Sequence, residues 1–93
     1  MKQIDVRITN DVGLHARPAG EFVKQSARFK SDIRIRNATR PTTGWADAKS
    51  ILSVLALGVE RGHTIDIMAD GPDEEEALQA LQNLIESNFV GTD

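Results

Sequence analysis

One short segment of the 93-residue sequence combines residue types that suit phosphoryl transfer: Gly13–Ala19, which reads GLHARPA. It places His15 two residues before Arg17. A neutral imidazole nitrogen is a nucleophile at about pH 7, and an arginine guanidinium offers a planar fork of donors that fits phosphate oxygens. The segment therefore predicts that His15 accepts a phosphoryl group and that Arg17 stabilises it.

The same segment changes from a turn to the start of a helix. Gly13 permits a sharp turn, and Pro18 suits a first helical turn because its missing N–H loses no hydrogen bond there. The first N–H groups of a helix lack intrahelical acceptors and form an anion site, so we expect the N–H of Ala16 to contribute to it. A histidine at this place can also be a surface residue or a cap, and on these residues alone that alternative stays open.

No general base, metal-ligand set or second nucleophile stands beside His15 in the sequence. We therefore expect a carrier that needs no metal and no cofactor, and not a self-sufficient enzyme. The size agrees, because 93 residues suffice for one compact domain, residues 1–93, in which a deep cleft would leave little core.

The composition restricts the surroundings in which such a carrier works. The chain has no cysteine, so no disulfide or thiolate metal site is expected. Its polar start is no secretory signal, and no apolar run approaches the roughly 18 residues of a membrane span. We expect a cytoplasmic monomer that does not bind membranes. A formal net charge of −3 argues against nucleic acid as the partner, although a binder using Arg34, Arg36 and Arg40 remains an alternative.

The hydrophobic pattern predicts the elements that must position His15. Alternating apolar residues predict strands around residues 4–8, 32–36, 45–47 and 64–69, and helical spacing predicts helices over 16–27, 48–57 and 73–85. Asp73 and Glu76 have the spacing of a capping box at the last helix. The order is strand, helix, strand, strand, helix, strand, helix. Because each strand has one apolar face, we expect an α+β fold with a four-stranded antiparallel sheet covered on one side by three helices.

The predicted helix 48–57 is apolar around nearly its whole circumference, yet only one side of it can face a sheet. We expect Val54 and Leu57 in the core. The other large apolar side chains of this helix are expected to form an exposed docking patch, namely Ile51, Leu52 and Leu55. Lys24 and Arg28, four residues apart on the first helix, are the predicted polar rim towards an acidic protein partner.

The segment Gly13–Ala19 closely resembles the active-site signature of the histidine-containing phosphocarrier (HPr) family, which serves the bacterial phosphoenolpyruvate-dependent sugar phosphotransferase system. The resemblance extends along nearly the whole chain, through Ile8–Asn10, Phe29–Ile33, Lys49–Ile51, Leu55–Val59 and Gly71–Leu81. It implies the open-faced β-sandwich fold of that family. It also implies that His15 takes the phosphoryl group on Nδ1 from enzyme I, that Arg17 supports it, and that IIA proteins or domains receive it for sugar uptake.

Several points stay open beside this resemblance. In Gram-positive relatives the serine matching Ser50 is phosphorylated by a dedicated HPr kinase/phosphorylase, which would make Ser50 a regulatory site. The other interpretation is that Ser50 only caps the start of a helix. One alternative function is that of the nitrogen-related regulatory branch of the family, which also keeps the histidine. Another alternative is a plain interaction domain, in which His15 would never be phosphorylated. The segment Asn37–Trp45 is longer than in typical members, and His63 is interpreted as a structural residue at a strand start.

Overall fold

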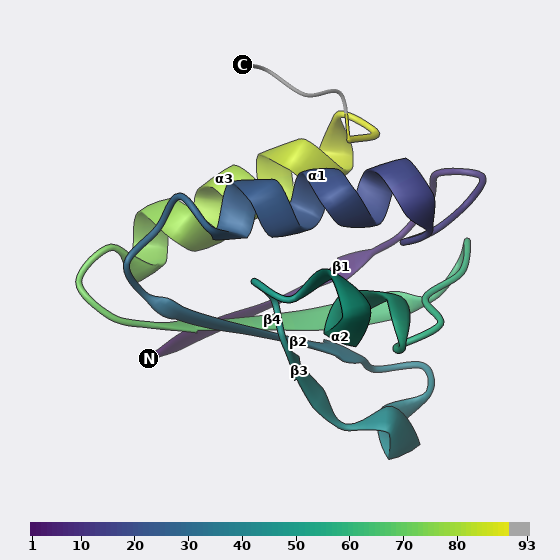
Figure 1. The fold of residues 1–93 in the computed structure, drawn as a ribbon, viewed down its shortest axis with the longest axis horizontal. Coiled ribbons are helices and arrows are strands. Elements are labelled where there is room, and N and C mark those ends of the chain that lie inside the picture. The colour runs from purple at the N-terminus through teal and green to yellow at the C-terminus, as the bar shows by residue number, and fades with distance from the viewer. Residues whose placement is uncertain (90–93) are drawn as a thin grey trace.

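The order of strands and helices expected from the sequence is the order found in a computed structural model of the chain, which describes residues 1–89. The elements, coloured along the chain in Figure 1, are β1 (Lys2–Arg7), α1 (Ala16–Ser26), β2 (Asp32–Asn37), a 3-10 turn η1 (Pro41–Thr43), β3 (Trp45–Asp47), α2 (Ile51–Leu55), β4 (Thr64–Asp70) and α3 (Glu74–Glu86). The predicted strand over residues 45–47 is therefore confirmed as β3.

The four strands form one antiparallel sheet in the order β1-β4-β2-β3. Ile67 of the central strand β4 lies opposite Ile4 of β1 and Ile35 of β2. Because side chains alternate across a strand, this register gathers apolar side chains on one face of the sheet. The other face carries polar side chains, among them Arg36 and Asp66, which form an ion pair at 2.6 Å.

The helices cover the apolar face and leave the polar face open, so the expected open-faced β-sandwich is confirmed. Figure 1 shows α1 and α3 side by side on one side of the sheet, and α2 packs against α1 and β3. Each helix contributes to one core cluster with the strands, through Phe22 of α1, Val54 of α2 and Leu81 of α3. The three helices are thus fixed relative to the sheet by a shared apolar core.

α2 ends two residues earlier than the helix predicted over residues 48–57 and begins three residues later, the later start because hydrogen bonds before it hold the chain in a turn. The Asp47 carboxylate accepts the Lys49 N–H at 2.9 Å, and the Asp47 carbonyl accepts the Ser50 N–H at 3.1 Å. The helix begins only at Ile51. Beyond its end Gly58 has a φ of 59°, the left-handed conformation that glycine commonly provides after a helix.

The capping box predicted for α3 is wrong. The Asp73 side chain makes no cap bond and instead accepts the N–H groups of Lys30 and Ser31, both at 2.9 Å, and the Ser31 hydroxyl. The Ser31 hydroxyl, followed by the Lys30 N–H, holds the pKa of Asp73 below its ordinary value. Glu74, and not Glu76, reaches back to the Gly71 N–H at 3.1 Å. Asp73 therefore ties the start of α3 to the connection between α1 and β2.

Candidate phosphoryl-acceptor site

His15 lies where the β1–α1 loop enters α1, and it is the N-cap residue of that helix. Its backbone is extended, with φ −109° and ψ 157°, and its exposed side chain makes no cap hydrogen bond. Ala16, the first residue of α1, has a φ of 42°, a conformation that residues other than glycine rarely adopt. This sharp turn leaves the imidazole exposed beside the first N–H groups of the helix, as the sequence predicted.

The loop that carries His15 rests on the loop that precedes β4. The Leu14 N–H donates to the Val59 carbonyl at 3.0 Å, and the Leu14 side chain is buried. Within the first loop, the Asn10 side-chain amide donates to the Gly13 carbonyl at 2.8 Å. Gly13 has a φ of 62°, and a Cβ there would lie 2.7 Å from the Cα of Glu60. The glycine is therefore required both by the backbone conformation and by the close approach of the two loops.

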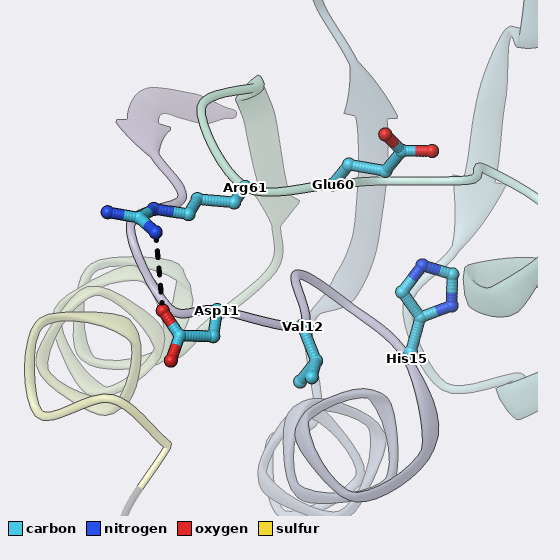
Figure 2. Close-up of a pocket in the computed structure, with 5 residues that line it drawn as sticks. All are labelled: Asp11, Val12, His15, Glu60 and Arg61. Atoms are coloured by element: carbon cyan, nitrogen blue, oxygen red, sulfur yellow. Dashed lines mark hydrogen bonds and ion pairs between the residues drawn. The ribbon is translucent and has the colours of Figure 1, made fainter.

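These two loops line a pocket beside the histidine that is open to solvent. Figure 2 shows its lining residues, which are Asp11, Val12, His15, Glu60 and Arg61. An ion pair of 3.4 Å joins Arg61 Nη1 to Asp11 Oδ1 at one side of the pocket. Sequence reasoning missed all of these residues except His15. No local pattern marks Glu60 and Arg61, because only the folded sheet brings their loop next to Gly13.

His63 and Asn37 hold the second loop in place. His63 Nδ1 accepts the Glu60 N–H at 3.1 Å and lies 3.1 Å from the Asn37 side-chain amide. The buried Asn37 also donates to the Leu57 carbonyl at 3.2 Å and accepts the Arg40 N–H at 3.2 Å. The structural interpretation of His63 is thus confirmed, and the beginning of the long segment Asn37–Trp45 is tied to the loop beneath the histidine.

Arg17 lies in the exposed first turn of α1, two residues beyond His15. Within residues 1–89 its guanidinium takes part in no ion pair, unlike that of Arg36 or Arg61. It does not line the pocket of Figure 2. Because α1 begins at Ala16, its first-turn N–H groups lie on the same short stretch of chain as the Arg17 guanidinium, which has no carboxylate partner in the described part of the chain.

The apolar side chains predicted to be exposed on α2 are exposed in the structure, although their role in docking a partner stays a prediction. Leu52 is 77% exposed, Ile51 39% and Leu55 36%, whereas Val54 is fully buried and Leu57 is 3% exposed. Lys24 and Arg28 are both exposed, on the neighbouring helix α1. The three exposed residues of α2, called the α2 patch below, form an apolar surface that the core does not use.

Ser50 is half-buried and caps α2, because its hydroxyl oxygen accepts the Ser53 N–H at 3.4 Å. The preceding Lys49 reaches the Phe29 carbonyl with its Nζ at 2.8 Å. The structural interpretation of Ser50 therefore has direct support, and the modification of Ser50 stays a prediction.

No group of three or more His, Asp or Glu side chains that could hold a metal ion is found among residues 1–89. In the same described part of the chain, no helix has the length and apolar character needed to cross a membrane.

Comparisons with known proteins agree with this geometry. Residues 2–87 match the family described as "PTS HPr component phosphorylation site". The phosphocarrier protein HPr of Mycoplasma genitalium is 38% identical over 90 residues, covering 97% of this chain and 99% of the relative. The multiphosphoryl transfer protein of Vibrio cholerae is 45% identical over 75 residues, which are 81% of this chain and 18% of that protein. The crystal structure of HPr-C-His from Thermoanaerobacter tengcongensis superposes with a TM-score of 0.89, at 41% identity and with both chains fully covered.

The match thus covers nearly the whole chain, includes the segment around His15, and is found in both sequence and fold. The chain belongs to the HPr family of phosphocarrier proteins of the phosphotransferase system.

Proposed function

We propose that this chain takes a phosphoryl group onto Nδ1 of His15 and passes it to another protein, acting in the cytoplasm as a relay and not as an enzyme with its own substrate turnover. One observation carries the proposal: an exposed histidine, with no cap bond, is the N-cap of α1. An 11-residue helix presents unpaired N–H groups and the positive end of its dipole at that place.

The transfer needs only groups that this segment provides. The Nδ1 lone pair attacks phosphorus, the bond between phosphorus and the donor breaks, and its electron pair leaves with the donor. The transferred group brings negative charge to the start of α1. The N–H groups of Ala16 and Arg17 and the Arg17 guanidinium are the donors nearest in the chain to stabilise that charge. The reverse attack by an acceptor returns His15 to its starting state.

The donor and acceptors are proposed from the family. The donor is enzyme I, which is itself charged by phosphoenolpyruvate, and the acceptors are IIA proteins or domains. The α2 patch is the proposed docking surface, with Lys24 and Arg28 as its polar rim, because exposed apolar residues beside charged ones are typical of protein interfaces. We propose that the chain works as one domain and as a monomer.

Ser50 is proposed as a regulatory site for an HPr kinase/phosphorylase. A phosphate at the start of α2 would add about −1.5 to −2 charges beside the α2 patch and weaken association with an acidic partner. Ser50→Asp should therefore bind enzyme I less tightly than Ser50→Ala in calorimetric titration. Equal affinities of the two variants would exclude regulation by charge at this position.

The decisive experiment is incubation with enzyme I and phosphoenolpyruvate, followed by intact mass measurement. We expect one added phosphoryl group, labile in acid and stable in alkali, on the wild-type chain and none on His15→Ala. A labelled His15→Ala chain would contradict the assignment, and an unlabelled wild-type chain would contradict the function. Running the sugar-branch and the nitrogen-branch enzyme I in parallel identifies the branch by the faster donor.

A further inference from the structure

Glu60 and His15 share the pocket of Figure 2, one from each of the two loops. The figure shows the imidazole with its Nε2 edge turned towards Glu60 and with Nδ1 turned away from it. The nitrogen proposed to attack phosphorus is therefore the one that Glu60 leaves open.

The backbone of Glu60 is fixed relative to the histidine loop. Its N–H donates to His63 Nδ1 at 3.1 Å, and the preceding carbonyl, of Val59, accepts the Leu14 N–H at 3.0 Å. Gly13 packs so closely on this backbone that a Cβ would lie 2.7 Å from the Glu60 Cα. The backbone of Glu60 is thus held against the loop that carries His15. Its exposed side chain lines the pocket, and Figure 2 shows no hydrogen bond between its carboxylate and the imidazole.

Of the two pocket carboxylates, Glu60 is the one that takes part in no ion pair among the described residues. The other one, Asp11, is paired with Arg61 at 3.4 Å. Within residues 1–89 Glu60 forms no ion pair. Its oxygens are consequently available to accept a hydrogen bond from a donor at the pocket. The Nε2 edge of His15 is turned towards Glu60.

We propose that Glu60 is a positioning residue for His15: its exposed carboxylate, which makes no hydrogen bond to His15 in this structure, turns to accept one from Nε2–H and so keeps the Nδ1 lone pair free. The hydrogen bond made by one ring nitrogen decides which of the two carries the proton. The inference rests on the proposed function, because it describes how the same histidine is prepared for attack.

The transfer step balances with this assignment. Nδ1 attacks phosphorus while the bond from phosphorus to the donor breaks and its electron pair leaves with the donor. Nε2 keeps its proton, so the phosphorylated ring is positively charged, and the proposed hydrogen bond to the exposed Glu60 carboxylate stabilises that charge. In the onward transfer the same protonated ring leaves with the electron pair of its N–P bond and is neutral again.

The test compares Glu60→Ala, Glu60→Gln and Asp11→Asn with the wild-type chain. The ¹⁵N chemical shifts of the His15 ring are measured on the unphosphorylated full chain at about pH 9, where a neutral ring reports its tautomer. Transfer from phosphorylated enzyme I is measured by rapid quench. The first measurement needs no donor, so it tests Glu60 even if the wild-type chain accepts no phosphoryl group, a result that would contradict only the proposed function.

We expect Glu60→Ala to shift the His15 ring ¹⁵N signals towards a mixture of tautomers and to slow transfer about tenfold. Glu60→Gln keeps an acceptor oxygen, so it should retain the wild-type ring signals while transfer is slowed by the missing charge. Asp11→Asn removes the same charge from the same pocket and should leave the ring signals unchanged. Wild-type ring signals in Glu60→Ala would overturn the proposal, and so would an equal change in Asp11→Asn.

Discussion

The Leu14 N–H donates to the Val59 carbonyl at 3.0 Å, which joins the loop before α1 to the loop before β4. Two more bonds join the same segments, because Ile8 donates to the His63 carbonyl at 2.8 Å and Gly62 donates to the Ile8 carbonyl at 2.7 Å. His15 follows Leu14 directly. The place of the imidazole is therefore set by a sheet-like pairing of two loops and not by α1 alone.

Gly13→Ala should damage this pairing. The new Cβ meets the backbone of Val59 and Glu60, at a φ of 62° that alanine rarely adopts. We expect a loss of about 1–3 kcal/mol in the free energy of unfolding, measured in urea. Gly20→Ala is the matched control, because Gly20 lies inside α1 with no atom within 4 Å of its added Cβ, and it should gain up to about 1 kcal/mol. Equal stabilities of the two variants would show that the two loops can move apart to accommodate the new Cβ without loss of stability.

Arg17→Ala should affect transfer much more than folding. The guanidinium is exposed and has no ion-pair partner within residues 1–89, so its loss removes little from the folded state. A hydrogen bond to a charged group contributes about 1.5–3 kcal/mol, which predicts a loss of about 10- to 100-fold in transfer rate from enzyme I.

The control for Arg17→Ala is Arg34→Ala, which removes the same charge from β2, where Arg34 pairs with Asp32 on the open face of the sheet. Melting temperatures and transfer rates are measured for both variants. A melting temperature that falls as steeply as the rate in Arg17→Ala would make the residue structural, and an equal loss of rate in Arg34→Ala would make the effect one of net charge.

The place of His15 at a helix start was predictable because its causes are local. Gly13, Pro18 and the change of hydrophobic period all lie within a few residues of it. The division of α2 into buried Val54 and exposed Leu52 was predictable for a similar reason, since a short apolar helix has only one side for a sheet.

The pocket was not predictable, because its residues meet only through tertiary pairing. Glu60 lines the same pocket as His15 because the Leu14 N–H bonds to the Val59 carbonyl, and no spacing in the sequence encodes that bond. The capping role predicted for Asp73 was wrong for a related reason, because a partner distant in the sequence competes with the local one. Its carboxylate could cap its own helix, yet two N–H groups and a hydroxyl of the Lys30–Ser31 segment offer it three donors together.

The contact of Asp73 should make stability depend on pH in acid. The pKa of Asp73 is held below its ordinary value of 3.8, first by the Ser31 hydroxyl and then by the Lys30 N–H. A carboxyl whose pKa is lower in the folded state stabilises the fold above its unfolded pKa and loses that effect as pH falls through the folded value. Asp73→Asn should therefore be less stable than wild type at neutral pH, and the difference in urea midpoints should shrink below pH 3.8. A difference that stays constant into acid would mean that the charge of Asp73 contributes nothing.

The α2 patch should separate docking from stability. Leu57 is buried, so Leu57→Ala should lose about 2–5 kcal/mol in the free energy of unfolding, and Val54→Ala should also melt earlier. Leu52 and Leu55 are exposed, so Leu52→Ala and Leu55→Ala should leave the melting curve nearly unchanged. If the patch contacts enzyme I, these two variants should weaken binding by about 1 kcal/mol or more in calorimetric titration.

The two pairs of α2 variants control for each other, because all four remove apolar atoms from one short segment. Val54→Ala and Leu57→Ala, measured at a temperature where they remain folded, should bind enzyme I nearly as tightly as wild type. Unchanged affinity in both Leu52→Ala and Leu55→Ala would exclude the patch as the docking surface. A large loss of melting temperature in Leu55→Ala would place that side chain functionally in the core, and the search for the interface would then turn to the rim formed by Lys24 and Arg28.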